Sequence, residues 1–276
     1  MKIYGINLDR RKDKWDILKK YNEKLTKKEI IRVSAIDGST LESTLNILKL
    51  FNNCVKIIKN GGYTPGIRKG VVGCALSHIK VWEHILYGDE EHAIIIEDDA
   101  VLEKDFDNKL ECVLNKLEPG WELVFLGLHP TSKTQNSFYA QDYETVNIKS
   151  MGPNFENENL QNGGTFGYMI SRKCCEKILK HYNAKSINGG IDCSLIHLNT
   201  RHKLIKINYL SPCIIRSSLE DQELIVGKER IRNRGDIQKN YELIKGISNF
   251  KLKDIQEVSS PIFDGEKYSI KHVITP

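Results

Sequence analysis

The sequence predicts an α/β protein built on a mostly parallel, Rossmann-like sheet flanked by helices. Strand-like apolar segments alternate with amphipathic helical segments over the first two thirds of the chain, the pattern of a doubly wound sheet. Residues 93–96 and 123–126 are uninterrupted apolar runs, as expected of strands that are covered on both faces. Sheets of this kind bind ligands beyond the carboxyl ends of their strands, so functional residues are expected there.

The individual elements follow from the spacing of apolar residues. Between residues 72 and 86 the apolar side chains recur every three or four positions, which predicts a strong helix ending near Gly88. Residues 131–161 are polar and aperiodic, which predicts a long loop or a β-excursion near the site. In chain order, the expected strands are 2–7, 29–35, 93–96, 123–126, 167–170 and 203–209, and the expected helices are 12–25, 41–51, 72–86 and 172–181.

The domain division is read from composition. A chain of 276 residues suits one large α/β domain with an extension. We expect the domain to span residues 1–219. Residues 220–276 turn charged, with a basic segment at 228–234, and are expected to form a helical or irregular extension that packs over the site.

The formal charge of +5 is a mild excess and the basic residues are scattered. It suits a protein that handles anionic ligands or touches an anionic membrane surface at its periphery, and a solvated lysine-rich surface explains it as well. Nucleic-acid binding is not expected, since the sequence has no zinc finger and no basic strand interleaved with aromatic residues. The sequence predicts no oligomeric state.

Cysteine usage bears on the compartment. The seven cysteines are irregularly spaced without a CxxC pair, which argues against a disulfide scaffold or a structural zinc site. Adjacent Cys174 and Cys175 are expected to open a helix, with one thiol buried and the other incidental. No apolar run approaches the roughly 20 residues that cross a bilayer. We therefore expect a cytoplasmic protein.

The acidic triplet Glu97-Asp98-Asp99 follows the apolar run at 93–96. A nucleoside diphosphate leaving group carries concentrated negative charge, and a divalent cation held by hard carboxylate oxygens neutralises it. In an extended segment Glu97 and Asp99 face one way and Asp98 faces the other. Asp99 is then the expected metal ligand, with Glu97 or Asp98 on the ribose hydroxyls. Three acidic residues that merely end a strand at the surface are the alternative.

Three ordered motifs carry a resemblance to a known family. They are INLDRR at residues 6–11, GCALSHIKVW at 73–82 and IIIEDDA at 94–100. Together they closely resemble glycosyltransferase family 25, which includes bacterial lipooligosaccharide glycosyltransferases and animal collagen galactosyltransferases. The resemblance covers roughly residues 1–215.

The resemblance implies a GT-A-type fold, a UDP-sugar donor, a requirement for Mn²⁺ (or Mg²⁺) and inversion at the anomeric carbon. The expected reaction moves galactose or glucose from the UDP-hexose donor to a hydroxyl of a glycan or glycosylated protein acceptor. A non-catalytic relative that serves as an interaction or adhesion module is the alternative. A nucleotidyltransferase, which would release pyrophosphate instead of UDP, is a further one.

The resemblance also implies roles for single residues. His78 would face the donor, although a core histidine satisfied by backbone is the competing interpretation. The glycines at 163–167 would let backbone approach a sugar. Asp192, after a glycine turn, would be the general base, although it is nearly as well explained as the N-cap of a helix beginning near Cys193. The expected donor-binding residues are Asn7, Leu8, Arg10, Arg11, Asp37 (otherwise a plain turn residue), Ser77, His78, Glu97 and Asp98.

Overall fold

The computed structural model describes residues 1–40, 69–128, 145–152, 165–185, 187 and 190–217. The helix predicted at 41–51 and the extension predicted at 220–276 lie outside these residues. The division of the chain at residue 219 therefore stays a prediction.

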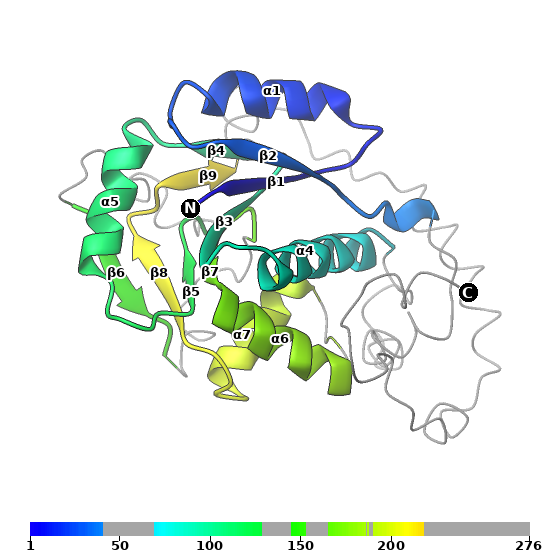
Figure 1. Cartoon of the computed structure of the whole chain (residues 1–276), viewed down its shortest axis with the longest axis vertical. Helices are drawn as coiled ribbons and strands as arrows, with labels where there is room; N and C mark the ends of the chain where they lie inside the picture. The colour runs from blue at the N-terminus through cyan, green and yellow to red at the C-terminus, as the bar shows by residue number, and fades with distance from the viewer. Residues whose placement is uncertain (41–68, 129–144, 153–164, 186, 188–189, 218–276) are drawn as a thin grey trace, which may run out of the picture.

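The core of the molecule is a seven-stranded sheet of order β2-β1-β3-β7-β5-β8-β6 (Figure 1). Its strands are β1 (Ile3–Asn7), β2 (Ile30–Ser34), β3 (His92–Glu97), β5 (Leu123–Phe125), β6 (Asn147–Ser150), β7 (Gly167–Ser171) and β8 (Ile207–Ser211).

Strand directions make the sheet mixed but mostly parallel. β1 is parallel to both β2 and β3, and β5 is parallel to β8. β7 is antiparallel to both of its neighbours, β3 and β5, so those two run in the same direction. β6 pairs antiparallel with β8 at the edge. Five of the seven strands therefore share one direction, with β7 inserted against them.

Helices cover both faces of this sheet (Figure 1). Along β3, Ala93 and Ile95 belong to the apolar cluster that includes side chains of α4, α6 and α7. The alternate residues Ile94 and Ile96 belong to the cluster that includes side chains of α1 and α5. This confirms the predicted α/β architecture, a mostly parallel sheet flanked by helices. The helices are α1 (Lys12–Asn22), α4 (Lys69–Tyr87), α5 (Phe106–Lys116), α6 (Arg172–Ala184) and α7 (Ile191–Thr200), with a short 3₁₀ turn, η1 (Gly38–Thr40).

A second, two-stranded sheet fixes the segment after the acidic triplet. It pairs β4 (Ala100–Leu102) antiparallel with β9 (Ile215–Ser217). The buried Asn22 of α1 donates from Nδ2 to the Ala100 carbonyl and accepts from the Leu102 N–H through Oδ1. The triplet is thus held between a core strand and a strand anchored to α1.

Some sequence expectations are corrected. The late strand expected at 203–209 is present, but it begins only at Ile207 and runs to Ser211, and Lys203 has a φ of 50° that is not compatible with a strand. Helix α5 was not expected, although Phe106, Leu110 and Val113 recur at helical spacing and are fully buried. The expectation that only one of Cys174 and Cys175 is buried is wrong, since both are fully buried at the start of α6.

Two further findings concern the described part of the chain. Each cysteine that the structure describes is a free thiol. No helix among the described residues has the length and apolarity needed to cross a membrane.

Candidate active site

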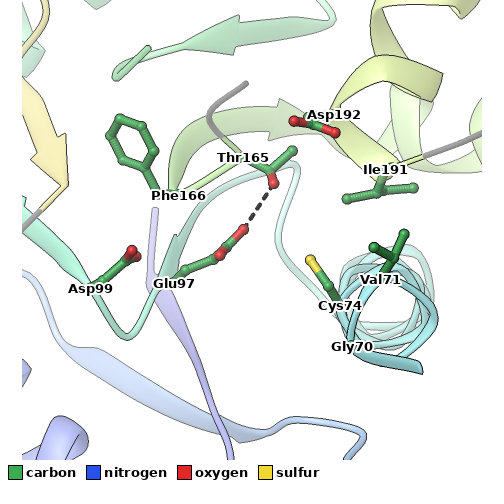
Figure 2. A pocket seen from close by; sticks show the side chains of 10 residues that line it. Gly70, Val71, Cys74, Glu97, Asp99, Thr165, Phe166, Ile191 and Asp192 are labelled. Carbon is green, nitrogen blue, oxygen red and sulfur yellow. Dashed lines mark hydrogen bonds between the residues drawn. The ribbon is translucent and has the colours of Figure 1, made fainter. Parts of the chain in front are cut away.

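A pocket of about 280 Å³ opens at the carboxyl end of β3 (Figure 2). Its size is close to the lower end of the roughly 300–1,000 Å³ that small-molecule sites occupy. Four segments of the chain form it: the first turns of α4, the end of β3 with the β3–β4 turn, the residues before β7, and the start of α7. The lining residues are Gly70, Val71, Cys74, Glu97, Asp99, Thr165, Phe166, Gly190, Ile191 and Asp192.

The acidic triplet divides as its alternation predicted. Glu97 ends β3 and lines the pocket together with Asp99. Asp98 is held elsewhere, since its Oδ2 accepts from Asn7 Nδ2 at 2.9 Å and its Oδ1 lies 3.2 Å from Lys14 Nζ. The geometry therefore favours Glu97 over Asp98 as the carboxylate that meets a ligand in this pocket.

Asp99 has one satisfied oxygen and one unsatisfied oxygen. Oδ2 accepts from Ser217 Oγ at 3.1 Å, whereas Oδ1 is buried and has no hydrogen-bond partner among the described residues. Burial, and next the charge of Glu97, raise the pKa of the Asp99 carboxyl. A buried acceptor without a partner costs free energy, and a divalent cation would supply both the partner and the compensating charge. The residues present therefore fit a hard metal ion bound at Asp99.

Glu97 is oriented by a chain of buried hydrogen bonds. Trp82 Nε1 donates to the Tyr168 hydroxyl, which lies 2.9 Å from His78 Nδ1, and His78 Nε2 lies 3.1 Å from Glu97 Oε1. A carboxylate oxygen can only accept a hydrogen bond, so the contact with Glu97 requires a proton on Nε2, and Nδ1 of the neutral ring accepts from the Tyr168 hydroxyl. This assigns the His78 proton to Nε2, from which it points at Glu97. Thr165 Oγ1 donates to the same Oε1 at 2.8 Å (Figure 2).

The structure places His78 and Ser77 behind the pocket lining. His78 is fully buried, as the competing interpretation of a core histidine has it, but its ring nitrogens contact the side chains of Tyr168 and Glu97 and not the backbone. Ser77 Oγ donates to the Gly73 carbonyl and accepts from the Ile36 N–H, which ties α4 to the segment after β2. Neither side chain is among those that line the pocket.

Asp192 lies on the pocket wall in the first turn of α7. The N-cap of that helix is Gly190, so the interpretation of Asp192 as the cap of a helix near Cys193 is wrong. Its Oδ1 accepts from the Cys193 N–H at 2.8 Å. A Cβ added to Gly190 would lie 2.6 Å from this same oxygen, so the glycine leaves the space that the carboxylate uses.

Asn7 is buried and its amide is used within the protein. Nδ2 donates to Asp98 Oδ2 and to the Arg11 carbonyl, and Oδ1 accepts from both Nε and Nη2 of Arg32. Asn7 thus joins the end of β1 to β2, to the start of α1 and to the triplet. In this structure it holds Asp98 and does not line the pocket.

The remaining predicted donor residues, which lie near the ends of β1 and β2, have partners within the protein. Arg10 Nε donates to Asp37 Oδ2 at 2.7 Å, and the hydrogen bonds from Ser39 and then from Arg10 lower the pKa of Asp37 to about 2. Arg11 pairs with Asp13, and the Leu8 carbonyl accepts from the Arg11 N–H. None of these residues lines the described pocket.

Seven of the ten lining residues were not predicted as site residues, and two of them, Cys74 and Thr165, carry side chains with polar or ligating atoms. Cys74 lies one helical turn before His78 on the same face of α4, and that spacing was the available signal. Thr165 lies in the segment whose glycines drew attention. Of those glycines, Gly167 makes room for a protein side chain, since an added Cβ would lie 2.7 Å from Ile215. Gly163 and Gly164 lie outside the described residues.

Known proteins resemble parts of this chain. "Putative glycosyltransferase R655" of Acanthamoeba polyphaga mimivirus is 29% identical over 183 residues, which are 64% of this chain and 51% of that protein. "Procollagen galactosyltransferase 2" of Mus musculus is 31% identical over 131 residues, 45% of this chain and 20% of that protein. "Inactive glycosyltransferase 25 family member 3" of Mus musculus is 32% identical over 103 residues, which are 34% of this chain and 16% of that protein. The chain thus spans about half the length of the first relative and about a fifth of the second.

A solved structure of the galactosyltransferase LgtC, in complex with donor and acceptor sugar analogues, aligns with 76% of this chain and 73% of its own. The identity is 12% and the TM-score 0.37. The profile described as "Glycosyltransferase family 25 (LPS biosynthesis protein)" matches residues 1–195, well over half of the sequence. The chain belongs to glycosyltransferase family 25.

Proposed function

We propose that this protein is an inverting, metal-dependent glycosyltransferase that moves galactose or glucose from a UDP-sugar to a hydroxyl of a glycan or glycosylated protein. One observation carries the proposal: Glu97 and Asp99, from the end of β3 and the turn after it, and Asp192, from the first turn of α7, line a single pocket at the carboxyl edge of the sheet. Three carboxylates around one pocket suit a metal-bound diphosphate and an acceptor that must lose a proton.

Asp99 is the proposed ligand for Mn²⁺ (or Mg²⁺). Its buried Oδ1 has no partner among the described residues, and burial already disfavours its charged form. When bound, the cation neutralises the charge that develops on the leaving diphosphate. Ser217 holds the other oxygen, which keeps the carboxylate turned toward the pocket.

Glu97 is the proposed contact for the ribose hydroxyls of the donor. His78 and Thr165 both donate to its Oε1, so its orientation is set before a ligand arrives. We further propose that the loop of Leu8, Arg10, Arg11 and Asp37 binds the uracil end of the donor. Asn7, Ser77 and His78 then support the site by positioning other residues, with Asn7 holding Asp98 in place.

Asp192 is the proposed general base. In an inverting transfer the acceptor oxygen attacks the anomeric carbon as UDP leaves with the electrons of the broken bond. Asp192 takes the proton of the attacking hydroxyl. Figure 2 shows Glu97 between Asp99 and Asp192, an arrangement that suits a donor held at Asp99 and an acceptor at Asp192.

We propose a cytoplasmic location, supported by the free thiols among the described cysteines. The scattered positive charge is compatible with peripheral contact with a membrane that carries the acceptor. No feature of the sequence supports a nucleic-acid partner.

A screen of UDP-sugars tests the proposed reaction. With Mn²⁺ present, we expect slow hydrolysis of UDP-galactose or UDP-glucose that releases UDP, and no release when the metal is chelated. Release of pyrophosphate would identify a nucleotidyltransferase instead. If folded protein released UDP from none of the donors and did not bind them, the proposal would be wrong.

A non-catalytic role is the second candidate, because one similar protein carries the name "Inactive glycosyltransferase 25 family member 3". Tight binding of a UDP-sugar without turnover, across all acceptors offered, would favour this candidate. The three clustered carboxylates favour the enzyme.

A further inference from the structure

We propose that Cys74, His78 and Glu97 form a second metal site, which binds a thiophilic divalent ion such as Zn²⁺. It differs from the hard-oxygen site at Asp99 in ligand chemistry, since it combines a thiolate, an imidazole and one carboxylate. Thiolate and imidazole ligands select Zn²⁺, whereas carboxylate ligands suit Mn²⁺ and Mg²⁺. The site itself does not depend on the proposed reaction.

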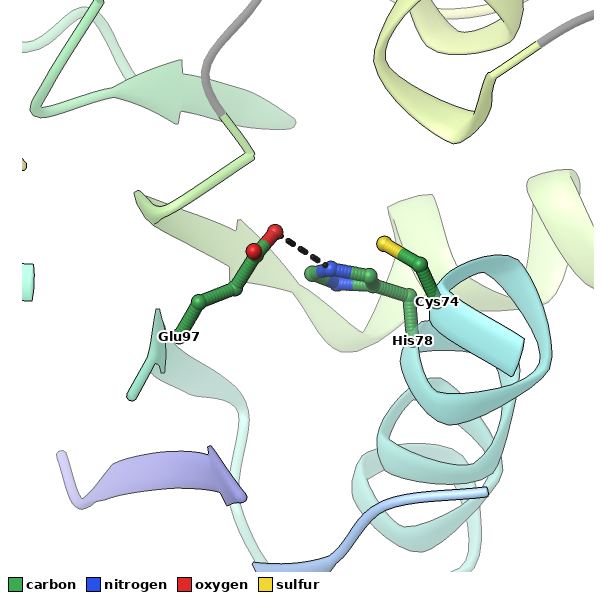
Figure 3. A group of neighbouring side chains, drawn as sticks. All are labelled: Cys74, His78 and Glu97. Atoms are coloured by element: carbon green, nitrogen blue, oxygen red, sulfur yellow. Dashed lines mark hydrogen bonds and ion pairs between the residues drawn. The ribbon is translucent and has the colours of Figure 1, made fainter. Parts of the chain in front are cut away.

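The ligand atoms are already close together. The Cys74 sulfur, a His78 ring nitrogen and a Glu97 carboxylate oxygen all lie within 4.8 Å of one another (Figure 3). Cys74 and His78 project from successive turns on one face of α4, and Glu97 reaches them from the end of β3. Zinc bonds of about 2.0–2.3 Å put tetrahedral ligands roughly 3.3–3.8 Å apart, so an adjustment of about 1 Å closes the site.

His78 has the supporting contact that a zinc-bound imidazole needs. Its Nδ1 lies 2.9 Å from the Tyr168 hydroxyl, which fixes the ring while Nε2 faces Glu97. The ion would take the place of the proton between Nε2 and Glu97. That proton moves to Nδ1, which then donates to Tyr168, and the Cys74 thiol loses its proton to solvent. The cost is the hydrogen bond that the Tyr168 hydroxyl gives to Nδ1.

The electrostatic environment favours a cation at this position. Burial raises the pKa of the Cys74 thiol, and the charges of Glu97, Asp192 and Asp99 raise it further. The negative potential that disfavours a bare thiolate attracts a divalent cation, and binding the ion deprotonates the thiol. Cys74 is partly exposed on the pocket lining, so an ion can reach it from the pocket.

Zinc bound at this site would affect the proposed reaction, and this part of the inference rests on the proposed function. Zn²⁺ would engage Glu97, the proposed ribose contact, and so oppose Mn²⁺-dependent binding of UDP. The protein would then be inhibited by zinc through a site that lies beside the catalytic metal.

Cobalt spectroscopy of the full chain tests the site directly, with Co²⁺ standing in for Zn²⁺. Chelator-treated wild-type protein is expected to develop a thiolate-to-cobalt charge-transfer band that Zn²⁺ abolishes. Cys74→Ser is expected to lack the band and to bind Zn²⁺ at least tenfold more weakly in calorimetry, and Glu97→Gln should weaken Zn²⁺ binding similarly. Cys112→Ser on α5 and Cys193→Ser beside Asp192 are matched controls, because both thiols are partly exposed like Cys74. Both variants are expected to keep the band, because neither cysteine belongs to the proposed site.

A band that survives in Cys74→Ser, or a wild-type protein that shows none, would overturn the proposal. Circular dichroism and the urea midpoint establish that each variant is folded. The result is separable from the proposed reaction. Wild-type protein that shows the band but never binds UDP would support the zinc site and contradict the glycosyltransferase proposal. Wild-type protein that binds UDP with Mn²⁺ but shows no band would contradict the zinc site and leave the glycosyltransferase proposal intact.

Discussion

Glu97 and Asp99 are two residues apart, but their carboxylates differ in how fully they are hydrogen-bonded within the protein. Glu97 Oε1 accepts from both His78 and Thr165, so this carboxylate is held by the fold. Asp99 Oδ1 is buried without a described partner, so that carboxylate is left for a ligand. Asp99 also lines the pocket, and departures from full polar satisfaction are expected at functional sites, so its free oxygen is a candidate for ligand binding.

At the residue scale, the base assignment is tested by Asp192→Asn. Asparagine keeps the size of the side chain but cannot take a proton from the acceptor, so kcat is expected to fall roughly 10²–10⁴-fold. The Mn²⁺-dependent affinity for UDP should stay within about twofold, because the proposed donor contacts are Glu97 and Asp99. Steady-state kinetics and calorimetry measure the two effects.

The exposed Asp89 provides the control for this variant, since Asp89→Asn changes the charge equally and should change neither quantity. Unreduced kcat in Asp192→Asn would assign the base to another group.

Some of these residues could be predicted from the sequence and others could not. Strand alternation was enough to put Glu97 and Asp99 on one side and Asp98 on the other. The role of Asn7 was not accessible, because its partner Arg32 lies 25 positions along the chain and on another strand. The same holds for Thr165, which meets Glu97 only because β7 pairs with β3.

At the element scale, helix α4, which contributes residues to the pocket, packs closely on η1. A Cβ added to Gly73 would lie 2.6 Å from the Gly38 nitrogen and the Ile36 carbonyl oxygen, which are backbone atoms. Gly73→Ala is therefore expected to lower the free energy of unfolding by about 1–3 kcal/mol in urea titration.

Gly70 provides the matched control on the same helix, because an added Cβ would meet nothing within 4 Å there. Gly70→Ala is expected to stabilise by roughly 0.5–1 kcal/mol through helix propensity. Equal effects at both positions would contradict the close packing of α4 on η1.

The buried chain from Trp82 through Tyr168 to His78 links α4 and β7 to the site. Tyr168→Phe removes the hydroxyl that both partners use, so unfolding free energy is expected to fall by about 1–3 kcal/mol. The loss of orientation at Glu97 should also weaken Mn²⁺-dependent UDP binding several-fold.

Tyr182→Phe separates these two effects. Tyr182 is also buried, and its hydroxyl bonds to Ser194 at 2.8 Å, away from Glu97. It is expected to lose stability but to keep UDP affinity. If both tyrosine variants bound UDP like the wild type, the chain would have no part in positioning Glu97.

The order of elements was predictable, whereas the direction of β7 was not. Residues 167–170 are apolar enough to predict a buried strand, and the structure confirms it. An apolar run carries no sign of its direction, which is set by long-range pairing with β3 and β5. The insertion matters for function, because it brings Tyr168 and Thr165 to the site.

At the scale of the whole molecule, one sheet with helices on both faces supports a site at its edge. The two apolar clusters that flank β3 are built from residues between Ile3 and Ile215. A core of that extent is expected to fold without the residues beyond the predicted boundary at 219.

A chain ending at residue 219 tests the domain prediction. It is expected to unfold cooperatively in urea, with a midpoint close to that of the full chain. A chain that aggregates or unfolds without a transition would show that residues 220–276 belong to the fold.

The central claim is that Asp99 holds a divalent cation that binds the donor diphosphate. Calorimetry of UDP with wild-type protein and with Asp99→Asn, each with and without Mn²⁺, tests it most directly. We predict that the wild type binds UDP only with Mn²⁺ and that Asp99→Asn binds at least tenfold more weakly.

Stability provides the control for that measurement. The folded-state pKa of Asp99 is raised, so its ionisation at neutral pH opposes folding, and asparagine lacks that cost. The metal-free variant should thus be as stable as the wild type or more so, by up to about 1 kcal/mol. UDP binding that needs no metal, or that persists undiminished in Asp99→Asn, would contradict the account.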